Sequence, residues 1–521
     1  MEGHLTTLRL TDLRQLFDDP ELSYLLIHDI LPNYLARRRW FGSKGSRTRQ
    51  VKVQVAQDLP LTDIKIVQLA VELGGKTETY LLPLVIGWDD VQPDTLSRQL
   101  ALARVEHEGR SGLLTDGFSR PELAFAVIRC LLEKPDTSGG IGGLQFVTTG
   151  EADLLALHQD TRVRWLSAEQ SNSSLIIGAA LMVKLIRRIF SGVHPEVEMT
   201  RHLTRIGYQN TAPLIGEVAM VASDGARSTI MIVQKAIANE GDAWTWMLSC
   251  LRAIMNDACV DNLHREGVNE RLATLVRFCS KIGLRLAELH CALAQPTDDV
   301  NFRAEKISSE TAQALSQCVQ EQIKDSFRVL RGRPDMISKA VEEEVRSLLT
   351  REPQILSNVD QLAQATIGTL MTRTHGDFHL GQVLVADEDA FIIDFEGEPS
   401  RNLELRRAKT HPLRDVAGLL RSLDYLAAST AADGGPDKTH CEAAEISSAF
   451  AAKAKQSFLD AYFLTRSQVA ALAYQRAVND RILKLFLLEK AAYEISYEAG
   501  NRPQWLTIPI AGLSAIASEL D

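Results

Sequence analysis

The chain has 521 residues, of which 45% are hydrophobic and 24% charged, a composition typical of a globular protein rather than a disordered or fibrous one. Its 57 Lys and Arg residues against 67 Asp and Glu residues give a net charge of −10, which disfavours a nucleic-acid partner held through phosphate contacts. A chain of this length exceeds what one hydrophobic core usually supports, so we expect about three structural units.

Alternating polar and apolar residues predict β-strands in the first half of the chain. After a helical segment, strands are expected at 51–55, 64–73 and 78–86 in a small antiparallel sheet. A Gly-rich break at 139–143 precedes further strands at 145–149, 162–165, 174–177 and 181–186, followed by a helix that begins at Pro195. These patterns indicate two neighbouring α+β units.

From about Asp242 onward, apolar residues recur with the 3.6-residue period of helices, apart from one hairpin at 383–386 and 390–395. The sequence therefore predicts an α+β fold in which a smaller β-rich part precedes a large helical part. We place the borders of three regions at 1–95, 96–238 and 239–521.

Two further features bear on the location of the protein. The seven cysteines form no C-x-x-C pair, so we expect reduced thiols in a cytoplasmic protein. The N-terminal segment lacks a signal-peptide core, and the longest apolar run, residues 175–183, is about half a membrane span. We therefore expect no membrane association.

The segment around Asp377 carries the residue types that phosphoryl transfer requires. This reaction needs a carboxylate that orients the acceptor hydroxyl and oxygen ligands that hold Mg²⁺ against the phosphates. Asp377 and Gln382 have the spacing of the catalytic Asp and the metal-binding Asn of protein kinases, and Asp394 ends the following hairpin. We expect Asp377 to accept the hydroxyl proton. Gln382, Asp394 and, as a further ligand, Glu396 are expected to bind Mg²⁺.

A lysine in an apolar strand is the candidate for holding the ATP phosphates. Lys184 lies in the strand expected at 181–186, and Glu196 and Glu198 open the helix that follows. Protein kinases fix such a lysine with a Glu of the next helix. We therefore expect an ion pair and prefer Glu198, one turn into the helix, as the partner. The alternative is a lysine that only extends its charge past a sheet edge.

No G-x-G-x-x-G loop is present to cover the phosphates. The polar turn at 169–174 stands in its place, and we expect hydroxyl and N–H groups of Ser171, Asn172 and Ser173 to approach ATP. A generic turn between two strands would have a similar composition. By its position in the chain, the segment 234–240, which begins with Gln234, is expected to connect two lobes and to receive adenine through its backbone.

Two groups of residues near the C-terminus have the chemistry to bind a sugar, because carboxylates accept hydrogen bonds from hydroxyls and aromatic rings lie against apolar sugar faces. The first group, on one helix and its extension, contains Tyr493, Glu494, Tyr497, Glu498 and Trp505. The second group, on a helix after the hairpin, contains Arg421, Asp424 and Tyr425. An ordinary amphipathic terminal helix is the alternative interpretation of the first group.

Several motifs occur in the order found in one known family. They lie at 39–44, 169–174, 184, 194–198, 239–242, 287–290, 374–399, 414–422 and 489–491. On these motifs the chain resembles the bacterial maltokinases, relatives of the aminoglycoside phosphotransferases, over nearly its whole length. The resemblance implies a bilobal protein-kinase-like fold. Its parts are an N-terminal cap (1–95), an intermediate subdomain that completes the N-lobe (96–238), and a helical C-lobe with the catalytic loop and acceptor site (239–521).

The resemblance also implies a reaction. The γ-phosphate of ATP would pass to the anomeric hydroxyl of maltose, with ATP and Mg²⁺ as cofactors, giving maltose 1-phosphate for α-glucan (glycogen) synthesis. Fused forms of the family make trehalose synthase a candidate partner.

Two alternatives to maltose phosphorylation remain open. A kinase for an amino sugar such as glucosamine, or for an aminoglycoside, could use the same acids to hold an ammonium group. A catalytically weak kinase-fold module could instead serve trehalose synthase. The intact set of Asp377, Gln382, Asp394 and Lys184 favours an active enzyme.

Overall fold

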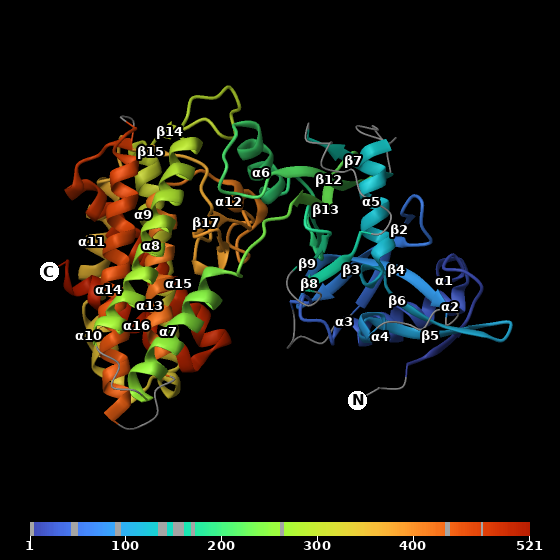
Figure 1. Ribbon diagram of the computed structural model, residues 1–521, viewed down its shortest axis with the longest axis horizontal. Helices are drawn as coiled ribbons and strands as arrows, with labels where there is room; N and C mark the ends of the chain where they lie inside the picture. Colours follow the sequence, from blue (N-terminus) through green and yellow to red (C-terminus); the bar gives the residue numbers. More distant parts are fainter. Residues whose placement is uncertain are drawn as a thin grey trace. The chain divides into compact units, whose positions relative to one another are not determined.

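The computed structural model describes residues 5–42, 50–88, 95–133, 143–149, 161–167, 172–260, 265–432, 438–469 and 472–520. The chain forms two compact units, Met1–Thr204 with Ala212–Ala238 and Arg205–Thr211 with Asn239–Asp521. The first unit contains two large sheets with helices, and the second is mainly helical (Figure 1). The expected α+β class is therefore confirmed.

A seven-stranded sheet opens the first unit. Its strands are β1 (Thr7–Arg9), β2 (Gln50–Asp58), β3 (Lys65–Leu73), β4 (Lys76–Trp88), β5 (Ala101–His107), β6 (Arg110–Asp116) and β11 (Arg188–Ile189). The order is β1-β5-β6-β4-β3-β2, with β11 paired to β4. The helices α1 (Gln15–Asp18), α2 (Pro20–Leu25), η1 (Leu26–Ile30) and α3 (Leu31–Leu35) share one apolar core with this sheet. The strands β5 and β6 were not expected from the sequence.

A six-stranded antiparallel sheet completes the first unit. Its strands are β7 (Gly143–Thr148), β8 (Val163–Ser167), β9 (Asn172–Ile177), β10 (Leu181–Ile186), β12 (Leu214–Val221) and β13 (Arg227–Lys235), in the order β7-β12-β13-β10-β9-β8. The remaining elements are α4 (Thr95–Gln99), η2 (Gly117–Ser119), α5 (Pro121–Glu133) and α6 (Pro195–Arg205). Apolar residues of both sheets and of α5 form one continuous core. The border expected at residue 95 falls between strands of the first sheet, and the division into three regions stays a prediction.

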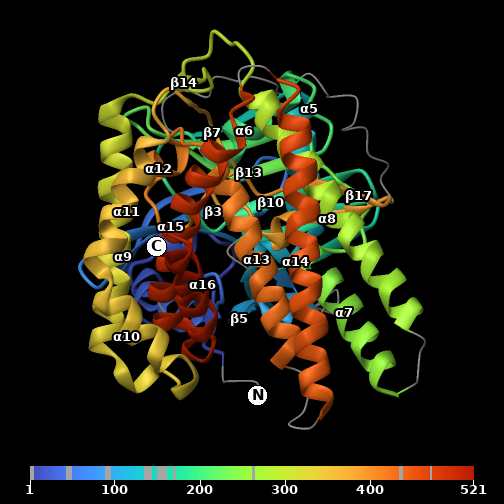
Figure 2. The same ribbon diagram turned by 90° about the vertical axis from the view of Figure 1, so that its left-hand side faces the viewer.

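The second unit is built from long helices. They are α7 (Ala243–Val260), α8 (Arg265–Leu293), α9 (Ser309–Gly332), α10 (Glu342–Thr350), α11 (Glu352–Gln364), α12 (Leu403–Arg407), α13 (Leu413–Ala432), α14 (Lys438–Arg466), α15 (Arg476–Asn501) and α16 (Thr507–Ser518). Helix α14 packs against α8 and α13, and α15 packs against α9, α13 and α16 (Figure 2). Among the described helices, none combines the length and apolar character needed to cross a bilayer.

Short strands and 3₁₀ turns connect the helices of the second unit. The strand pairs are β14 (Glu305–Lys306) with β15 (Leu370–Met371) and β16 (Val383–Ala386) with β17 (Asp389–Ile392), and the 3₁₀ turns are η4 (Pro334–Met336), η5 (Lys339–Val341), η6 (Leu380–Gln382) and η8 (Pro503–Trp505). The hairpin β16–β17 was expected. Its turn residues Asp387 and Glu388 have φ values of 50° and 57°, which is the left-handed conformation of a tight two-residue hairpin turn.

Candidate active site

A carboxylate on α13 holds the loop at residues 374–379, which we call the catalytic loop after the role predicted for it from the sequence. Asp415 accepts hydrogen bonds from the backbone N–H groups of His375 and Gly376, at 2.7 and 2.9 Å. Gly376 has a φ of 86°, a conformation that glycine adopts without the steric cost of a side chain. His375 Nε2 lies 2.8 Å from the carbonyl oxygen of Ile393. The loop is therefore tied both to α13 and to the segment that follows β17.

Asp415 is itself part of a buried polar chain. His290 Nε2 lies 3.1 Å from Asp415 Oδ2, and His290 Nδ1 lies 2.9 Å from Tyr462 Oη. Burial raises the pKa of the Asp415 carboxyl, but the hydrogen bonds from His290 and from the N–H of Gly376 outweigh burial, so the pKa lies below its usual value. Asp415 is therefore ionised, and an ionised carboxylate is the stronger acceptor for the loop N–H groups.

Asp377, the expected catalytic residue, forms an ion pair with Lys490 on α15. Lys490 Nζ lies 3.2 Å from Asp377 Oδ1. Burial raises the pKa of Asp377, but the charges of Lys490 and His379 outweigh burial and hold the pKa below its usual value. Conversely, Asp377, Glu494 and Glu398 raise the pKa of Lys490 against the effect of burial. At neutral pH the pair is therefore a carboxylate beside an ammonium group.

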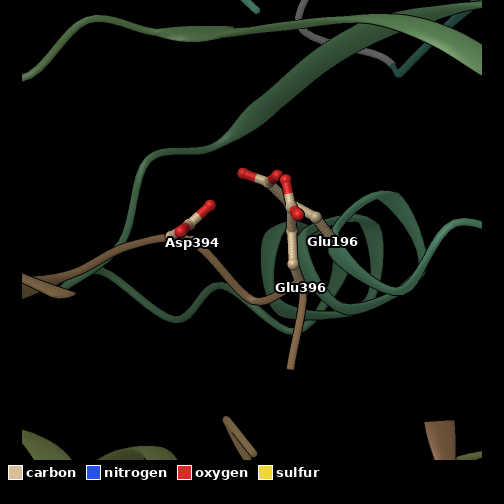
Figure 3. A group of neighbouring side chains, drawn as sticks. All are labelled: Glu196, Asp394 and Glu396. Atoms are coloured by element: carbon tan, nitrogen blue, oxygen red, sulfur yellow. The ribbon is translucent and has the colours of Figure 1, made fainter. Parts of the chain in front are cut away.

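The expected metal ligands of the second unit lie around the end of the hairpin. Gln382 donates a hydrogen bond from Nε2 to Asp394 Oδ2 at 3.1 Å, and Asp394 has a φ of 68°. Figure 3 draws Asp394 and Glu396 on the segment that follows β17. Glu396 Oε2 lies 3.3 Å from Arg406 Nη2. Glu196, also drawn in Figure 3, belongs to α6 of the first unit.

The residues around Asp394 fit a divalent cation of the magnesium type. Such cations prefer carboxylate and amide oxygens and usually keep several waters. Asp394 and Gln382 provide one oxygen-bearing group each, already within hydrogen-bond distance of one another. Glu396 already forms an ion pair with Arg406, so it is a weaker candidate than Asp394.

Lys184, the lysine expected to bind the nucleotide, forms an ion pair with Glu196 rather than with Glu198. Lys184 Nζ on β10 lies 2.6 Å from Glu196 Oε2, and both side chains are buried. The preferred partner, Glu198, is corrected to Glu196. Two residues along a helix are separated by about 200° around its axis, so only one of the two carboxylates can face a given strand. The side chain of Glu198 is half-buried one turn into α6.

The remaining residues expected to contact ATP lie inside the sheet of the first unit or outside the described residues. Ser171 is outside them. Asn172 and Ser173 begin β9, and the buried Ser173 hydroxyl accepts a hydrogen bond from Arg187 Nε at 2.8 Å. Gln234 is 4% exposed on β13, where it pairs with Met182 and Leu214. Gln234 therefore belongs to the sheet rather than to the connecting segment, which corrects the expected start of that segment.

The two expected acceptor groups form one network on α13, α15 and η8. Arg421 lies 2.9 Å from both Glu494 and Asp424. The Tyr425 hydroxyl donates to Glu498 at 3.2 Å. Two ring pairs are stacked: Tyr425 with Trp505 at 5.8 Å and Tyr493 with Tyr497 at 6.0 Å between ring centres. All eight expected residues thus lie in a single cluster of carboxylates, cations and rings.

The carboxylates of this cluster already have protein partners. Glu498 is buried and accepts from Tyr425 and, through both oxygens, from Arg502. Burial raises the pKa of Glu494, and the charge of Arg421 only partly offsets this effect. These buried acids therefore hold α13 and α15 together, whereas Tyr493 and Tyr497 are more exposed and better placed to meet a ligand.

A second group of charges has no role predicted from the sequence, although Glu398, Arg414 and Glu489 lie within the motifs at 374–399, 414–422 and 489–491. Arg401 and Arg414 both lie between Glu398 and Glu489, with ion-pair distances of 2.9 to 3.3 Å. This network ties the segment after Asp394 to α15. Lys490 was missed in the same way. The signal for it was its position one turn before Tyr493 and Glu494, which puts the three on one helical face.

Comparison with known proteins gives a family model for part of the chain. Residues 34–119 match the maltokinase N-terminal cap domain. Two curated relatives are glucosamine kinases. The protein of Mycolicibacterium smegmatis is 26% identical over 68% of this chain and 80% of its own length, and that of Streptacidiphilus jiangxiensis is 25% identical over 69% and 74%.

A solved glucosamine kinase in complex with glucosamine, ADP and inorganic phosphate has a related fold. It aligns with a TM-score of 0.61 and 19% identity, covering 93% of this chain and 98% of its own. A second crystal form gives a TM-score of 0.62 at 18% identity, covering 90% and 94%. The chain therefore carries a maltokinase N-terminal cap domain at residues 34–119 and has the kinase-like α+β fold of the solved glucosamine kinases.

Proposed function

We propose that this chain is an ATP-dependent sugar kinase that phosphorylates the anomeric hydroxyl of maltose, giving maltose 1-phosphate for α-glucan (glycogen) synthesis. The observation that carries the proposal is the ion pair between Asp377 and Lys490. Lys490 lies on the same helix as Tyr493, and its ammonium group is 5.1 Å from the Tyr493 ring centre. A catalytic carboxylate and an aromatic sugar-binding surface are thereby linked by one side chain.

Asp377 has the properties required of the catalytic acid–base group. Its lowered pKa keeps it ionised at neutral pH, so it can accept a hydrogen bond from the sugar hydroxyl and orient that oxygen toward the γ-phosphorus. The new O–P bond forms as the bond from the γ-phosphorus to the bridging oxygen of ADP breaks. The hydroxyl proton passes to Asp377. ADP and the sugar phosphate leave.

For the nucleotide we propose two sets of groups, each described within its own unit. In the first unit, Lys184 would bind the phosphates and Glu196 would fix the lysine. In the second unit, Asp394 and Gln382 would hold Mg²⁺, with Glu396 as a further candidate. When bound, Mg²⁺ neutralises developing charge on the phosphate oxygens.

Maltose and glucosamine are the two candidate acceptors. The cap domain at 34–119 supports maltose. The stacked Tyr493 and Tyr497 also support it, because two adjacent rings suit a disaccharide better than a single sugar. The names of the curated relatives support glucosamine. An aminoglycoside is a further candidate acceptor, because the same carboxylates could bind its ammonium groups.

An assay of ADP release, coupled to NADH oxidation, separates these candidates. Purified chain with ATP and Mg²⁺ is given maltose, glucose, glucosamine, trehalose or kanamycin in turn. We expect the highest kcat/KM with maltose and a product phosphorylated at the anomeric carbon by ³¹P NMR. A preference for glucosamine would replace the acceptor but keep the kinase. If the purified chain alone turned over none of these acceptors and became active only when trehalose synthase was added, the result would instead support a catalytically weak module that serves trehalose synthase.

A further inference from the structure

A cavity of about 430 Å³ lies in the second unit where α14 ends and α15 begins. Its lining combines apolar and aromatic side chains, including Phe463, Leu472 and Tyr474, with the polar residues Arg466 and Asn479. The described residues that line it include none of those assigned above to catalysis, metal binding or the acceptor. Its volume is within the range of about 300–1,000 Å³ found for small-molecule sites.

Arg466 is a charged side chain without a counter-charge at this cavity. It is 1% exposed. Its Nη1 donates to Asn479 Oδ1 at 3.3 Å, whereas Nε and Nη2 have no hydrogen-bond partner among the described residues. No carboxylate of the described chain forms an ion pair with it. The rings of Tyr462 and Tyr474 lie 5.9 and 5.5 Å from the guanidinium carbon, and rings attract a cation without neutralising it.

Two other arginines of this unit, the half-buried Arg414 and the buried Arg421, have counter-charges. Arg414 pairs with Glu398 and Glu489, and Arg421 pairs with Glu494 and Asp424. A buried charge that lacks such a partner is strongly unfavourable. The lone guanidinium beside a cavity therefore indicates that the missing counter-charge comes from a bound molecule.

The two acids that line the cavity do not supply this counter-charge. Both are exposed. Asp480 lies 4.0 Å from Arg476 Nε, and Asp460 accepts a hydrogen bond from Gln456 at 2.7 Å. They define an outer, polar rim, while Arg466 and Asn479 lie in the interior.

We propose that this cavity binds a small organic anion, whose carboxylate or phosphate group pairs with Arg466 and whose apolar body packs against Phe463 and Leu472. The apolar lining argues against a simple inorganic ion, because such an ion would leave most of the cavity wall without contacts. This inference does not depend on the proposed kinase reaction.

The site is connected to the catalytic loop through a short series of contacts. Arg466 lies over the ring of Tyr462, whose hydroxyl contacts His290 at 2.9 Å. His290 contacts Asp415 at 3.1 Å, and Asp415 binds the N–H of Gly376 at 2.9 Å. An anion at Arg466 changes the electric field at the first member of this series.

Thermal unfolding of the full chain tests the proposal, with benzoate and phenyl phosphate as probes at constant ionic strength. A ligand that binds the folded state raises the melting temperature in a saturable way. We expect such a rise with at least one of these probes. Benzyl alcohol, which lacks the charge, and inorganic phosphate, which lacks the apolar body, are expected to have smaller effects. If neither benzoate nor phenyl phosphate gave a saturable rise in melting temperature, the proposal would be overturned and the cavity would hold water only.

Two variants locate the effect. In Arg466→Gln the response to the probe is expected to disappear. In Arg476→Gln, which changes an exposed arginine on the rim of the same cavity, the response is expected to persist. Equal responses in wild type and Arg466→Gln would place the probe elsewhere and overturn the assignment.

A crystallographic measurement covers the case in which Arg466→Gln does not fold. Crystals of the wild-type chain soaked in 4-bromobenzoate should show an anomalous bromine peak in the cavity with the carboxylate toward Arg466. A peak found only at other positions, or none, would refute the site.

Discussion

Lys490 on α15 donates a hydrogen bond to Asp377 of the catalytic loop at 3.2 Å, and the same ammonium group lies 5.1 Å from the centre of the Tyr493 ring. One cation therefore contacts the proposed acid–base group and the proposed sugar-binding surface. Burial raises the pKa of Asp377, and the charge of Lys490 lowers it. The position of Lys490 fixes the distance between that carboxylate and α15. The proposed catalysis and acceptor binding are thus expected to respond together to changes at Lys490.

Asp377→Asn should lower kcat by about 10²-fold or more, because positioned acid–base groups contribute on that scale. The side chain keeps its size, so the melting temperature and the Kd for ATP should stay near the wild-type values. ADP release, calorimetric titration with ATP and thermal unfolding check the three quantities. Near-normal turnover of the folded variant would remove Asp377 from the mechanism.

Lys490→Gln should shift the acidic limb of the pH–kcat/KM profile to higher pH. Lys490 lowers the pKa of Asp377, so its removal raises that pKa. Activity that needs the ionised carboxylate is present above the pKa and is lost as the pH falls through it. The loss therefore begins at a higher pH in the variant. Lys490→Arg keeps the charge and should keep the wild-type limb, and an unshifted profile in Lys490→Gln would contradict the electrostatic role.

Asp394→Ala should abolish Mg²⁺-dependent turnover, because Gln382 alone does not neutralise the phosphate charges. Activity is measured against Mg²⁺ concentration up to saturation. Asp387→Asn is the matched control. It changes an exposed acid in the turn of the same hairpin, and Asn tolerates its left-handed φ of 50°. Activity of Asp394→Ala at saturating Mg²⁺ would mean that another carboxylate is the ligand.

Asp415→Asn should lower the free energy of unfolding by about 3 kcal/mol or more, the usual result of removing one partner from a buried charged network. The pKa of Asp415 is lowered in the folded state. Its stabilising contribution is therefore complete above the unfolded-state pKa of about 3.9 and is lost as the pH falls through the folded-state pKa. Urea unfolding as a function of pH measures both effects.

The control for this change is Asp480→Asn, which removes an exposed ion pair to Arg476 at 4.0 Å. Such pairs contribute about 0–1 kcal/mol. Equal losses in Asp415→Asn and Asp480→Asn would contradict the anchoring role of Asp415.

Tyr493→Ala should raise KM for maltose with little change in kcat or in KM for ATP. A ring that packs against a part of the sugar that does not react binds the ground state and the transition state about equally. Trp505→Ala is expected to act in the same direction, with some loss of stability because Trp505 stacks on the buried Tyr425. Unchanged KM for maltose in a stably folded Tyr493→Ala enzyme would remove the aromatic surface from acceptor binding.

The sequence predicted those parts of the site that depend on neighbouring residues in the chain. The hairpin after Gln382 was predicted because two short apolar runs lie on either side of a polar turn. The spacing of Asp377, Gln382 and Asp394 pointed to one segment, and the structure places the last two in hydrogen-bond contact. The pairing of Tyr493 with Tyr497 followed from helical periodicity.

Features that depend on the direction of a side chain or on contacts between distant segments could not be predicted from the sequence. Glu196 and Glu198 have the same chemistry, and only the rotation of α6 decides which one meets Lys184. Serine is common in turns, but the hydroxyl of Ser173 accepts a hydrogen bond from Arg187 within the sheet. Asp415 binds N–H groups about 40 residues earlier in the chain, and no local pattern reports such a contact.

The anchors of the catalytic loop have a consequence for protein synthesis. Lys490 follows Asp377 by 113 residues, and Asp415 also follows the loop. A nascent chain of which only the segment up to this loop has emerged from the ribosome lacks both Asp415 and Lys490. The loop therefore gains its backbone anchor when α13 folds and its charge partner when α15 folds, so the proposed kinase activity can appear only after α15 has been synthesised.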